Sequence, residues 1–330
     1  MVPPAMLLCV DVGGTKTTLA LLADARTCTP IRIETHRSAE VSDFGRLLAD
    51  CAVRAAGTLD AVALGIAGPV VGTRVETTNL PWVIDADALS AELGVPVFLL
   101  NDLEALAWGI PVLADDALVV LNAGRAVPGG TIAVIAAGTG LGQAGLVWDG
   151  RRWLALASEG GHADFAPRSE QEIALLRHLS RRFEHVSWER VVSGPGVVNL
   201  FEFLRDAEGH AVPAALAAVM AADDPGAAIT AAGLAGVPIA STALDLFVEL
   251  YGAEAGNLAL KLKAVGGVYV GGGIAPKILP RLCDGRFRAA FVAKGRFRAL
   301  LEDVPVRVIL DERTPLYGAA RYAAERLADG

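Results

Sequence analysis

The feature that most constrains the fold is a pattern of strand, glycine turn and strand that occurs twice. In the first copy, the apolar runs Met6–Val10 and Thr17–Leu22 flank the segment Asp11-Val12-Gly13-Gly14-Thr15-Lys16. About 125 residues later, Gly138-Thr139-Gly140-Leu141-Gly142 lies between two further apolar runs. The repeat predicts a duplicated domain that grips phosphate from two sides. Two unrelated hairpins are the alternative.

Glycine turns of this kind suit phosphate because backbone N–H groups without a neighbouring Cβ can approach phosphate oxygens closely. The spacing matches neither the GxxxxGK[ST] loop nor a GxGxxG segment that opens a helix, so the P-loop and Rossmann patterns are excluded. A type I′ hairpin with positive φ at Gly13 and Gly14 is the structural alternative for the first turn. A third cluster, Gly271-Gly272-Gly273, ends the apolar run Val268–Val270 and could receive a flat ring, although such a triplet alone often marks only a turn.

Length and the order of apolar segments predict an α/β protein of two domains with a cleft between them. The chain has 330 residues, whereas one domain usually has roughly 100–200. We expect a smaller domain of residues 1–112 plus 312–330 and a larger domain of residues 113–311. The chain ends would then pack together, because the last helix returns to the first domain.

The longest predicted helix covers Thr242–Lys263 and begins with a capping box of Thr242 and Asp245. Gly252 and Gly256 lie four residues apart on one face of it. Since each glycine weakens a helix by roughly 1 kcal/mol relative to alanine, we expect another element to approach this face closely.

Charge and cysteine content limit the classes of partner. The formal net charge is −8, which opposes a broad surface for nucleic acid or acidic membranes. The basic stretch Arg281–Arg298 is therefore expected to be a solvated face or a surface next to phosphate rather than a nucleic-acid site. Four cysteines without CxxC spacing are typical of reduced thiols in a cytoplasmic protein. The apolar stretch Ala5–Val10 is too short for a signal peptide or membrane anchor.

Several motifs in a fixed order resemble the bacterial glucokinase family, which belongs to the actin-like ATPase (ribonuclease H-like) superfamily of sugar kinases. The motifs are Asp11–Thr15, Asn101-Asp102, Gly138–Gly142, Ser158-Glu159-Gly160-Gly161-His162 and Gly271–Gly273. The likeness extends to Thr78–Trp82, Glu189–Gly196 and Phe287–Phe291, so it covers nearly the whole chain. It implies two actin-like domains, a homodimer, and transfer of the γ-phosphoryl group of ATP to the 6-hydroxyl of glucose.

The resemblance also implies roles for individual residues. Asp102 would be the base that faces the sugar 6-hydroxyl, and Asp11 would position Mg²⁺ through water. The sugar ligands would be Asn79, Asn101, Asp102, Glu159, His162 and Glu189. The nucleotide would be held by Asp11, Gly13, Gly14, Thr15, Gly138, Thr139, Gly140, Gly272 and Gly273.

Physical chemistry supports two of these roles independently. Asp102 follows the apolar run Val97–Leu100, so the sheet would fix a carboxylate that accepts a proton during phosphoryl transfer. Glu159 and His162 are three residues apart with two glycines between them, so a tight backbone can point both side chains at vicinal hydroxyls. Lone histidines of this kind are otherwise often capped loop residues.

The match has two departures. Lys16 follows the first turn where many glucokinases carry Asn, whereas Lys is common there in the related repressor and sugar kinase group. That group has a Cys-rich zinc motif, but residues 163–190 contain no cysteine, so zinc is not expected. A kinase for mannose, fructose or an amino sugar, and a sugar-sensing regulator without turnover, are the competing functions.

Overall fold

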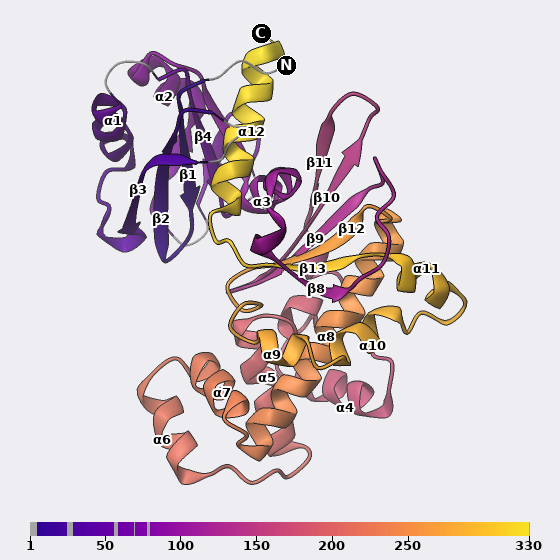
Figure 1. Ribbon diagram of the computed structural model, residues 1–330. Helices are drawn as coiled ribbons and strands as arrows, with labels where there is room; N and C mark the ends of the chain where they lie inside the picture. Colours follow the sequence, from indigo (N-terminus) through magenta and orange to yellow (C-terminus); the bar gives the residue numbers. More distant parts are fainter. Residues whose placement is uncertain (1–4, 25–28, 56–58, 69, 78–79, 330) are drawn as a thin grey trace. The chain divides into compact units, whose positions relative to one another are not determined.

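The computed structural model describes residues 5–24, 29–55, 59–68, 70–77 and 80–329 (Figure 1). The chain divides into two compact units. The first unit contains residues 1–117, 153–157 and 311–330, and the second contains residues 118–152 and 158–310.

The first unit is built on a five-stranded sheet in the order β3-β2-β1-β4-β7. The strands are β1 (Leu7–Val12), β2 (Lys16–Leu22), β3 (Pro30–Arg37), β4 (Ala61–Ile66) and β7 (Val97–Asn101). β1, β4 and β7 are parallel, whereas β2 and β3 follow as an antiparallel meander. A separate two-stranded ribbon pairs β5 (Arg74–Glu76) with β6 (Val83–Asp85).

Helices cover both faces of this sheet because its central strands are apolar on both sides. On one face, α1 (Phe44–Arg54) and α2 (Ala86–Leu93) pack on alternate residues of β1 and β4. Asp43 and Asp85 cap the two helices with their carboxylates. On the other face, α12 (Thr314–Asp329) packs on the remaining residues of the same strands, beside α3 (Asp102–Gly109).

The contact between α3 and α12 depends on glycines. A Cβ on Gly318 would overlap the carbonyl oxygen of Ala105, and a Cβ on Gly109 would overlap that of Thr314. The helices therefore approach backbone to backbone. Gly65 of β4 similarly leaves room for the Ala105 side chain. The helix that begins at Asp102 is thus fixed between the sheet and α12.

The other sheet has six strands in the order β11-β10-β9-β12-β13-β8. Five of these strands belong to the second unit, whereas residues 153–157 of the edge strand β11 belong to the first. The strands are β8 (Leu118–Asn122), β9 (Ile132–Ala137), β10 (Leu141–Trp148), β11 (Trp153–Ser158), β12 (Gly267–Gly271) and β13 (Val306–Ile309). β9 and β10 form an antiparallel hairpin, and β12 is parallel to both β9 and β13. The sheet therefore repeats the hairpin and parallel neighbour of the first unit.

One face of this sheet is buried under the helices of the second unit, which form the largest apolar core. The helices are α4 (Glu170–Leu179), α5 (Gly194–Asp206), α6 (Ala214–Ala222), α7 (Pro225–Leu234), α8 (Pro238–Leu262), α9 (Leu279–Leu282), α10 (Arg286–Val292) and α11 (Arg298–Asp303). Within the described residues no single helix is long and apolar enough to cross a membrane, and α7 with α8 meets that test only as a pair bent by 99°.

The sequence predictions for helices are confirmed in part. A close approach at Gly252 and Gly256 is confirmed, since Cβ atoms there would meet the carbonyl oxygens of Phe287 and Phe291 in α10. The predicted start of that helix at Thr242 is wrong, because α8 begins at Pro238. Proline fits the first helical position, and the Thr242 hydroxyl instead donates to the Pro238 carbonyl inside the helix.

Candidate functional site

The first group of candidate residues lies at the carboxyl edge of the parallel strands in the first unit. In register, Val12 of β1 lies beside Ile66 of β4, which lies beside Asn101 of β7. Asp11 directly precedes Val12, and Asp102 directly follows Asn101. The sheet therefore brings the two carboxylates to the same edge. Ligands of open α/β sheets bind at this edge.

The pKa of Asp11 shows that the charge of Asp102 acts on it. The pKa of Asp11 is raised to about 6, chiefly because burial desolvates its charge and secondly because of the negative charge of Asp102. The Lys16 ammonium opposes this shift. A partly buried pair of carboxylates of this kind favours a cation or a proton nearby.

Asn101 and Asp102 form the start of α3. The Asn101 Oδ1 accepts from the Leu103 amide at 2.9 Å, and Glu104 accepts from the Asn101 amide, which completes a capping box. The Asn101 Nδ2 donates to the Gly68 carbonyl at 3.0 Å. Asp102 is the first residue of the helix, where the helix dipole favours negative charge.

The first glycine turn joins β1 to β2 and is braced from outside the hairpin. The Gly13 amide donates to the Lys16 carbonyl at 3.0 Å, and the Ser38 hydroxyl donates to the Gly13 carbonyl at 2.7 Å. Ser38 is buried and also lies 3.0 Å from the Thr17 hydroxyl. Neither Gly13 nor Gly14 has positive φ, so the type I′ alternative is wrong. Gly14 and Thr15 are exposed at the tip.

Lys16 extends from the base of this turn. Its Nζ lies 2.6 Å from Glu312 Oε2, and both side chains are more than half exposed. An ion pair with this exposure adds little stability. The contact therefore leaves Lys16 able to exchange its partner for another anion.

The second glycine turn joins β9 to β10 and is held by long-range contacts. The Gly138 amide donates to the Gly140 carbonyl at 2.8 Å, and the Gly194 amide at the start of α5 donates to the Gly138 carbonyl at 2.8 Å. The Leu141 amide donates to Glu189 Oε2 at 3.0 Å. A Cβ on Gly140 would come within 2.5 Å of the same oxygen. Glu189 thus rests directly on the turn.

The glycine triplet lies beside the base of this turn. Gly272 has φ of +82° and passes so close to the Ala137 carbonyl that a Cβ would overlap it. The buried Tyr251 hydroxyl of α8 accepts from the Ala137 amide at 3.1 Å and lies 3.3 Å from the Gly271 carbonyl oxygen. Burial raises the pKa of Tyr251, so the hydroxyl stays protonated. Tyr251 joins the ends of β9 and β12.

His162 ends a short 3-10 turn, Gly160–His162, and Glu159 directly precedes it, next to the second glycine turn. His162 Nε2 lies 4.0 Å from Glu159 Oε2, and both side chains are mostly exposed. A Cβ on Gly161 would overlap the Leu141 carbonyl oxygen, so this turn packs on the start of β10. We call the segment Glu159–His162 the acidic turn.

The structure therefore brings the predicted residues together in two groups. The first unit joins Asp11, Gly13, Gly14, Thr15, Asn101 and Asp102 at one sheet edge. The second unit joins Gly138, Thr139, Gly140, Glu159, His162, Glu189, Gly272 and Gly273 around the end of β9. The predicted sugar ligand Asn79 lies outside the described residues. Ser38 and Tyr251 were not predicted, because hydroxyl residues in such positions carry no local signal.

Metal ligands do not cluster in the described part of the chain. No group of three or more His, Cys, Asp or Glu side chains is close enough to hold an ion by itself among the residues that the structure describes. Asp11 is a single carboxylate, which suits Mg²⁺ that keeps water and phosphate oxygens as its other ligands.

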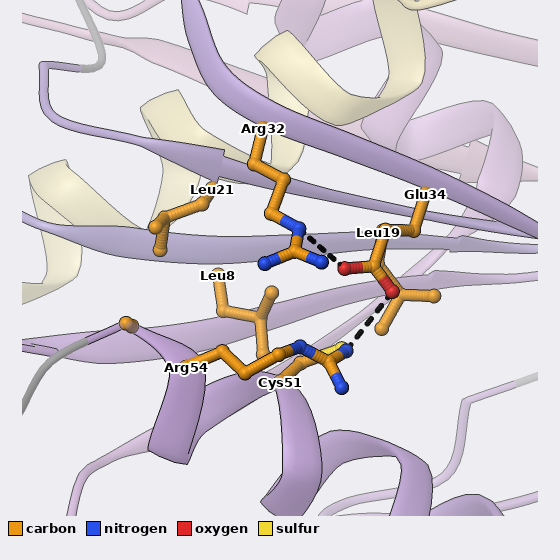
Figure 2. A pocket seen from close by; sticks show the side chains of 8 residues that line it. Leu8, Leu19, Leu21, Arg32, Glu34, Cys51 and Arg54 are labelled. Atoms are coloured by element: carbon orange, nitrogen blue, oxygen red, sulfur yellow. Dashed lines mark hydrogen bonds and ion pairs between the residues drawn. The ribbon is translucent and has the colours of Figure 1, made fainter.

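A small cavity in the first unit lies away from these groups (Figure 2). Leu8 and Leu19 form its apolar wall, and Glu34 pairs with Arg32 at 2.6 Å and with Arg54 at 2.9 Å across it. Burial raises the pKa of the Cys51 thiol there. The lining residues include none of the predicted site residues, and their charges are paired with one another.

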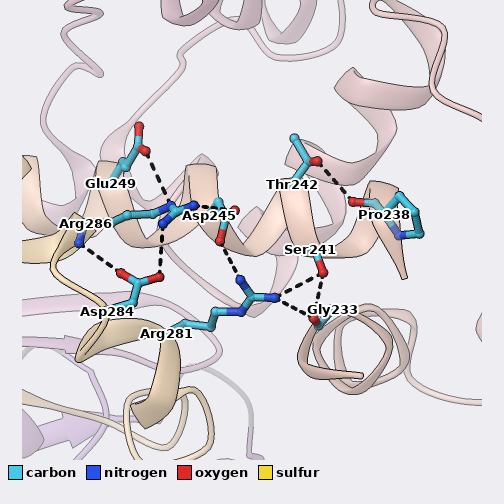
Figure 3. Close-up of polar contacts among 9 residues, drawn as sticks. All are labelled: Gly233, Pro238, Ser241, Thr242, Asp245, Glu249, Arg281, Asp284 and Arg286. Atoms are coloured by element: carbon cyan, nitrogen blue, oxygen red, sulfur yellow. Dashed lines mark hydrogen bonds and ion pairs between the residues drawn. The ribbon is translucent and has the colours of Figure 1, made fainter. Parts of the chain in front are cut away.

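Two arginines of the basic stretch Arg281–Arg298, Arg281 and Arg286, are paired with acidic side chains (Figure 3). Arg281 pairs with Asp245 at 3.0 Å and also donates to the Gly233 carbonyl. Arg286 pairs with Asp245 at 3.1 Å and with Asp284 at 3.2 Å. These guanidinium groups therefore serve the packing of α8 against α9 and α10.

Comparison with known proteins gives one consistent result. The model of the family "Glucokinase" matches residues 8–326. A glucokinase of Nostoc punctiforme is 42% identical over 97% of this chain and 99% of its own, and one of Yersinia pestis is 38% identical over 96% of each.

Solved structures agree with the sequence relatives. A glucokinase from an Antarctic psychrotroph has a TM-score of 0.84 and 29% identity, covering 96% of this chain and 98% of its own. A ROK family glucokinase from Streptomyces griseus, in complex with glucose and AMPPNP, shares the fold at a TM-score of 0.64 and 22% identity, covering 96% and 98%. These matches confirm the predicted fold class, an α/β protein with two actin-like ATPase domains. With its family model matched from residue 8 to residue 326, the chain belongs to the glucokinase family.

Proposed function

We propose that Asp102 is the general base with which this chain, a glucose kinase that uses ATP, phosphorylates the sugar 6-hydroxyl. The observation that carries the proposal is the meeting of Asp11 and Asp102 at one sheet edge, where the charge of Asp102 raises the pKa of Asp11. Both are fixed by strands and by the start of α3 rather than by mobile loops. The reaction gives glucose 6-phosphate and ADP.

In the proposed step the 6-hydroxyl oxygen attacks the γ-phosphorus while the bond from that phosphorus to the ADP oxygen breaks. The hydroxyl proton passes to the Asp102 carboxylate. The Leu103 amide donates to Asp102 Oδ1 at 2.9 Å, which orients the carboxylate before the sugar arrives. A positioned base contributes about 10²–10⁴ in rate, and alignment with charge neutralisation supplies the rest.

Backbone groups of the two glycine turns are proposed to hold the phosphates. Gly13, Gly14 and Thr15 would contact one side, and Gly138, Thr139 and Gly140 the other, because both turns present residues without a Cβ or with a hydroxyl. Asp11 would hold Mg²⁺ through water, and the ion would neutralise phosphate charge. Gly272 and Gly273 would lie against the adenosine, since no Cβ covers the backbone there.

The acidic turn and Glu189 are proposed to read the sugar hydroxyls, together with Asn101 and Asn79. Carboxylates and an imidazole can both accept and orient hydroxyl protons, and an analogue without a bonded hydroxyl would leave these groups unpaired. Glu189 Oε2 already accepts from the Leu141 amide, so its other oxygen is the one proposed to face the sugar.

The test is Asp102→Asn, which keeps the size of the side chain but removes the proton acceptor. With ATP, Mg²⁺ and a panel of glucose, mannose, fructose, glucosamine and N-acetylglucosamine, kcat for glucose should fall by about 10² or more, while KM should change little. The matched control is Asp116→Asn, an exposed carboxylate in the same unit. Near-normal turnover in Asp102→Asn would mean that the base is elsewhere.

The domain boundaries, assembly and location of the protein are also proposed. Residues 1–112 with 312–330, and residues 113–311, are proposed as the two domains, which the division into two compact units supports. A homodimer is proposed on the family resemblance, and sedimentation would measure it. Cytoplasmic location is proposed because no disulfide joins Cys9, Cys51 and Cys283, the cysteines among the described residues. The absence of a nucleic-acid partner is proposed because Arg281 and Arg286 are paired with acidic side chains (Figure 3).

A further inference from the structure

A chain of hydrogen-bonded polar side chains, most of them buried, runs from Lys294, just after α10, to the acidic turn. Glu254 on α8 is completely buried and Gln143 on β10 is 1% exposed. The Gln143 Nε2 donates to Glu254 Oε1 at 2.8 Å, and the Asn257 Nδ2 donates to Glu254 Oε2 at 2.8 Å. The Lys294 Nζ donates to the Asn257 Oδ1 at 2.6 Å and to the Ala253 carbonyl at 2.9 Å.

The direction of every hydrogen bond in this chain is fixed by its charged members. An ammonium group only donates, so the oxygen of the Asn257 amide faces Lys294 and its nitrogen faces Glu254. An ionised carboxylate only accepts, so Gln143 presents its nitrogen to Glu254. The oxygen of the Gln143 amide is consequently directed the other way.

That oxygen lies against the acidic turn. A Cβ on Gly160 would overlap Gln143 Oε1, so the amide forms the floor on which Gly160 rests. The Gly160 amide is held separately by the Ser158 hydroxyl at 3.0 Å. Gly161 rests on the Leu141 carbonyl of the same strand, so β10 supports the whole turn.

From this geometry we propose that Glu254 is a positioning residue, which orients Gln143 and thereby fixes the turn that carries Glu159 and His162. Glu254 touches no reactant in the proposed function. The inference depends on the proposed function only in treating the acidic turn as part of the sugar site. Buried polar networks that are fully satisfied specify one arrangement of their surroundings.

The pKa of Lys294 indicates that burying the charge of this network costs free energy. The pKa of Lys294 is lowered to about 8, chiefly because burial desolvates the ammonium and secondly because of Arg168, with a smaller lowering effect from Lys261. Glu254 and Glu172 act in the opposite direction. The Lys294 ammonium also offsets the negative charge of Glu254, as does Lys261, whose Nζ lies 3.7 Å from Glu254 Oε1.

The experiment compares wild type with Glu254→Gln. Asn257 still donates to residue 254, so the new amide presents its nitrogen to Gln143, and Gln143 must turn its oxygen toward residue 254 and its nitrogen toward Gly160. Hydrogen exchange by mass spectrometry should accelerate by about tenfold in peptides that contain the His162 and Ala163 amides, which close the turn. KM for glucose should rise by about tenfold, while kcat and KM for ATP should stay within about threefold.

Two further variants sharpen the test. The double variant Gln143→Glu with Glu254→Gln exchanges the amide and the carboxylate, so an amide nitrogen again donates to a carboxylate oxygen between these two positions. Hydrogen exchange and KM for glucose should then return toward wild type. Glu249→Gln, on the same helix but about half exposed, is the matched control and should change neither. If Glu254→Gln does not fold, Lys294→Met provides the same readouts from the partly exposed end of the network, with a smaller effect in the same direction.

The outcomes separate the inference from the proposed function. Unchanged exchange at the acidic turn in a folded Glu254→Gln protein would overturn the inference. Faster exchange with an unchanged KM for glucose would confirm the positioning role and instead contradict the assignment of the turn to the sugar. Faster exchange throughout the second unit would show a general loss of stability and would also overturn it.

Discussion

The two glycine turns follow the same strand pattern but are held in different ways. The first has charged groups in its own segment, Asp11 and Lys16, and a single brace from Ser38. The second has no charged side chain between Gly138 and Gly142 and takes its carboxylate from Glu189, about 50 residues away in the sequence. The comparison suggests that the first turn supplies charged groups from its own segment, whereas the position of the second turn depends on residues far away in the sequence.

The largest effect should come from removing charge at the first turn. Asp11→Asn should lower kcat by about 10² or more, since phosphoryl transfer depends on neutralising the phosphate oxygens. At neutral pH the same change should raise the melting temperature by a few degrees, because a desolvated carboxylate is lost. Differential scanning calorimetry without ligands and a coupled kinase assay measure the two effects.

The pH dependence of this gain has a defined sign. The pKa of Asp11 is raised to about 6 from 3.8, so the native state binds more protons than the unfolded state between these values. The stability contributed by protonated Asp11 is present below about pH 4 and is lost as the pH rises through about 6. The melting-temperature advantage of Asp11→Asn should therefore grow across this window, and a constant difference would contradict the assignment.

A smaller effect should come from disturbing the contact between Glu189 and the second turn. Gly140→Ala places a methyl group where it would come within 2.5 Å of Glu189 Oε2, so the carboxylate must move away from the Leu141 amide. KM for glucose should rise by about tenfold. Gly138→Ala is the comparison for KM of glucose only, because a Cβ there meets nothing within 4 Å although Gly138 is itself proposed to contact phosphate. Equal effects of the two alanines would mean that Glu189 does not link this turn to the sugar.

The smallest effect should come from the brace of the first turn. Ser38→Ala leaves the Gly13 carbonyl and the Thr17 hydroxyl without this partner, which costs about 1–3 kcal/mol when the groups are buried. We expect a lower melting temperature and a rise in KM for ATP of about threefold, with kcat nearly unchanged. Ser42→Ala, at an exposed position nearby, should behave like wild type. A larger change in KM for glucose than in KM for ATP would argue against a role in phosphate binding.

Much of the sheet framework could be predicted because its strands are apolar runs that end in glycine or in an acid. β3 was not predicted, since it is an edge strand whose residues are largely exposed and alternate with charges. The start of α8 was placed four residues late because Thr242 satisfies the local capping pattern, whereas Pro238 begins the helix in the folded chain. Local patterns therefore located the elements better than their ends.

The supporting residues of the site could not be predicted for a different reason. Ser38 and Tyr251 act on backbone groups 25 and 114 residues away, and Gln143 acts on Gly160 only because Glu254 fixes its amide. Each role depends on which side chains the tertiary fold brings together. The motifs reveal the residues proposed to touch the reactants, while the residues that hold those motifs in place become visible only in the structure.

The packing of α12 on β1 and β4 has a consequence for how the protein is made. During synthesis these strands leave the ribosome while the whole second unit is still to come, and their apolar face stays uncovered until residues 314–329 follow. The second unit, whose sheet and helices are nearly contiguous in sequence, can close its core earlier. The sheet that positions Asp11 and Asp102 is thus covered on this face only after the whole second unit has been synthesised.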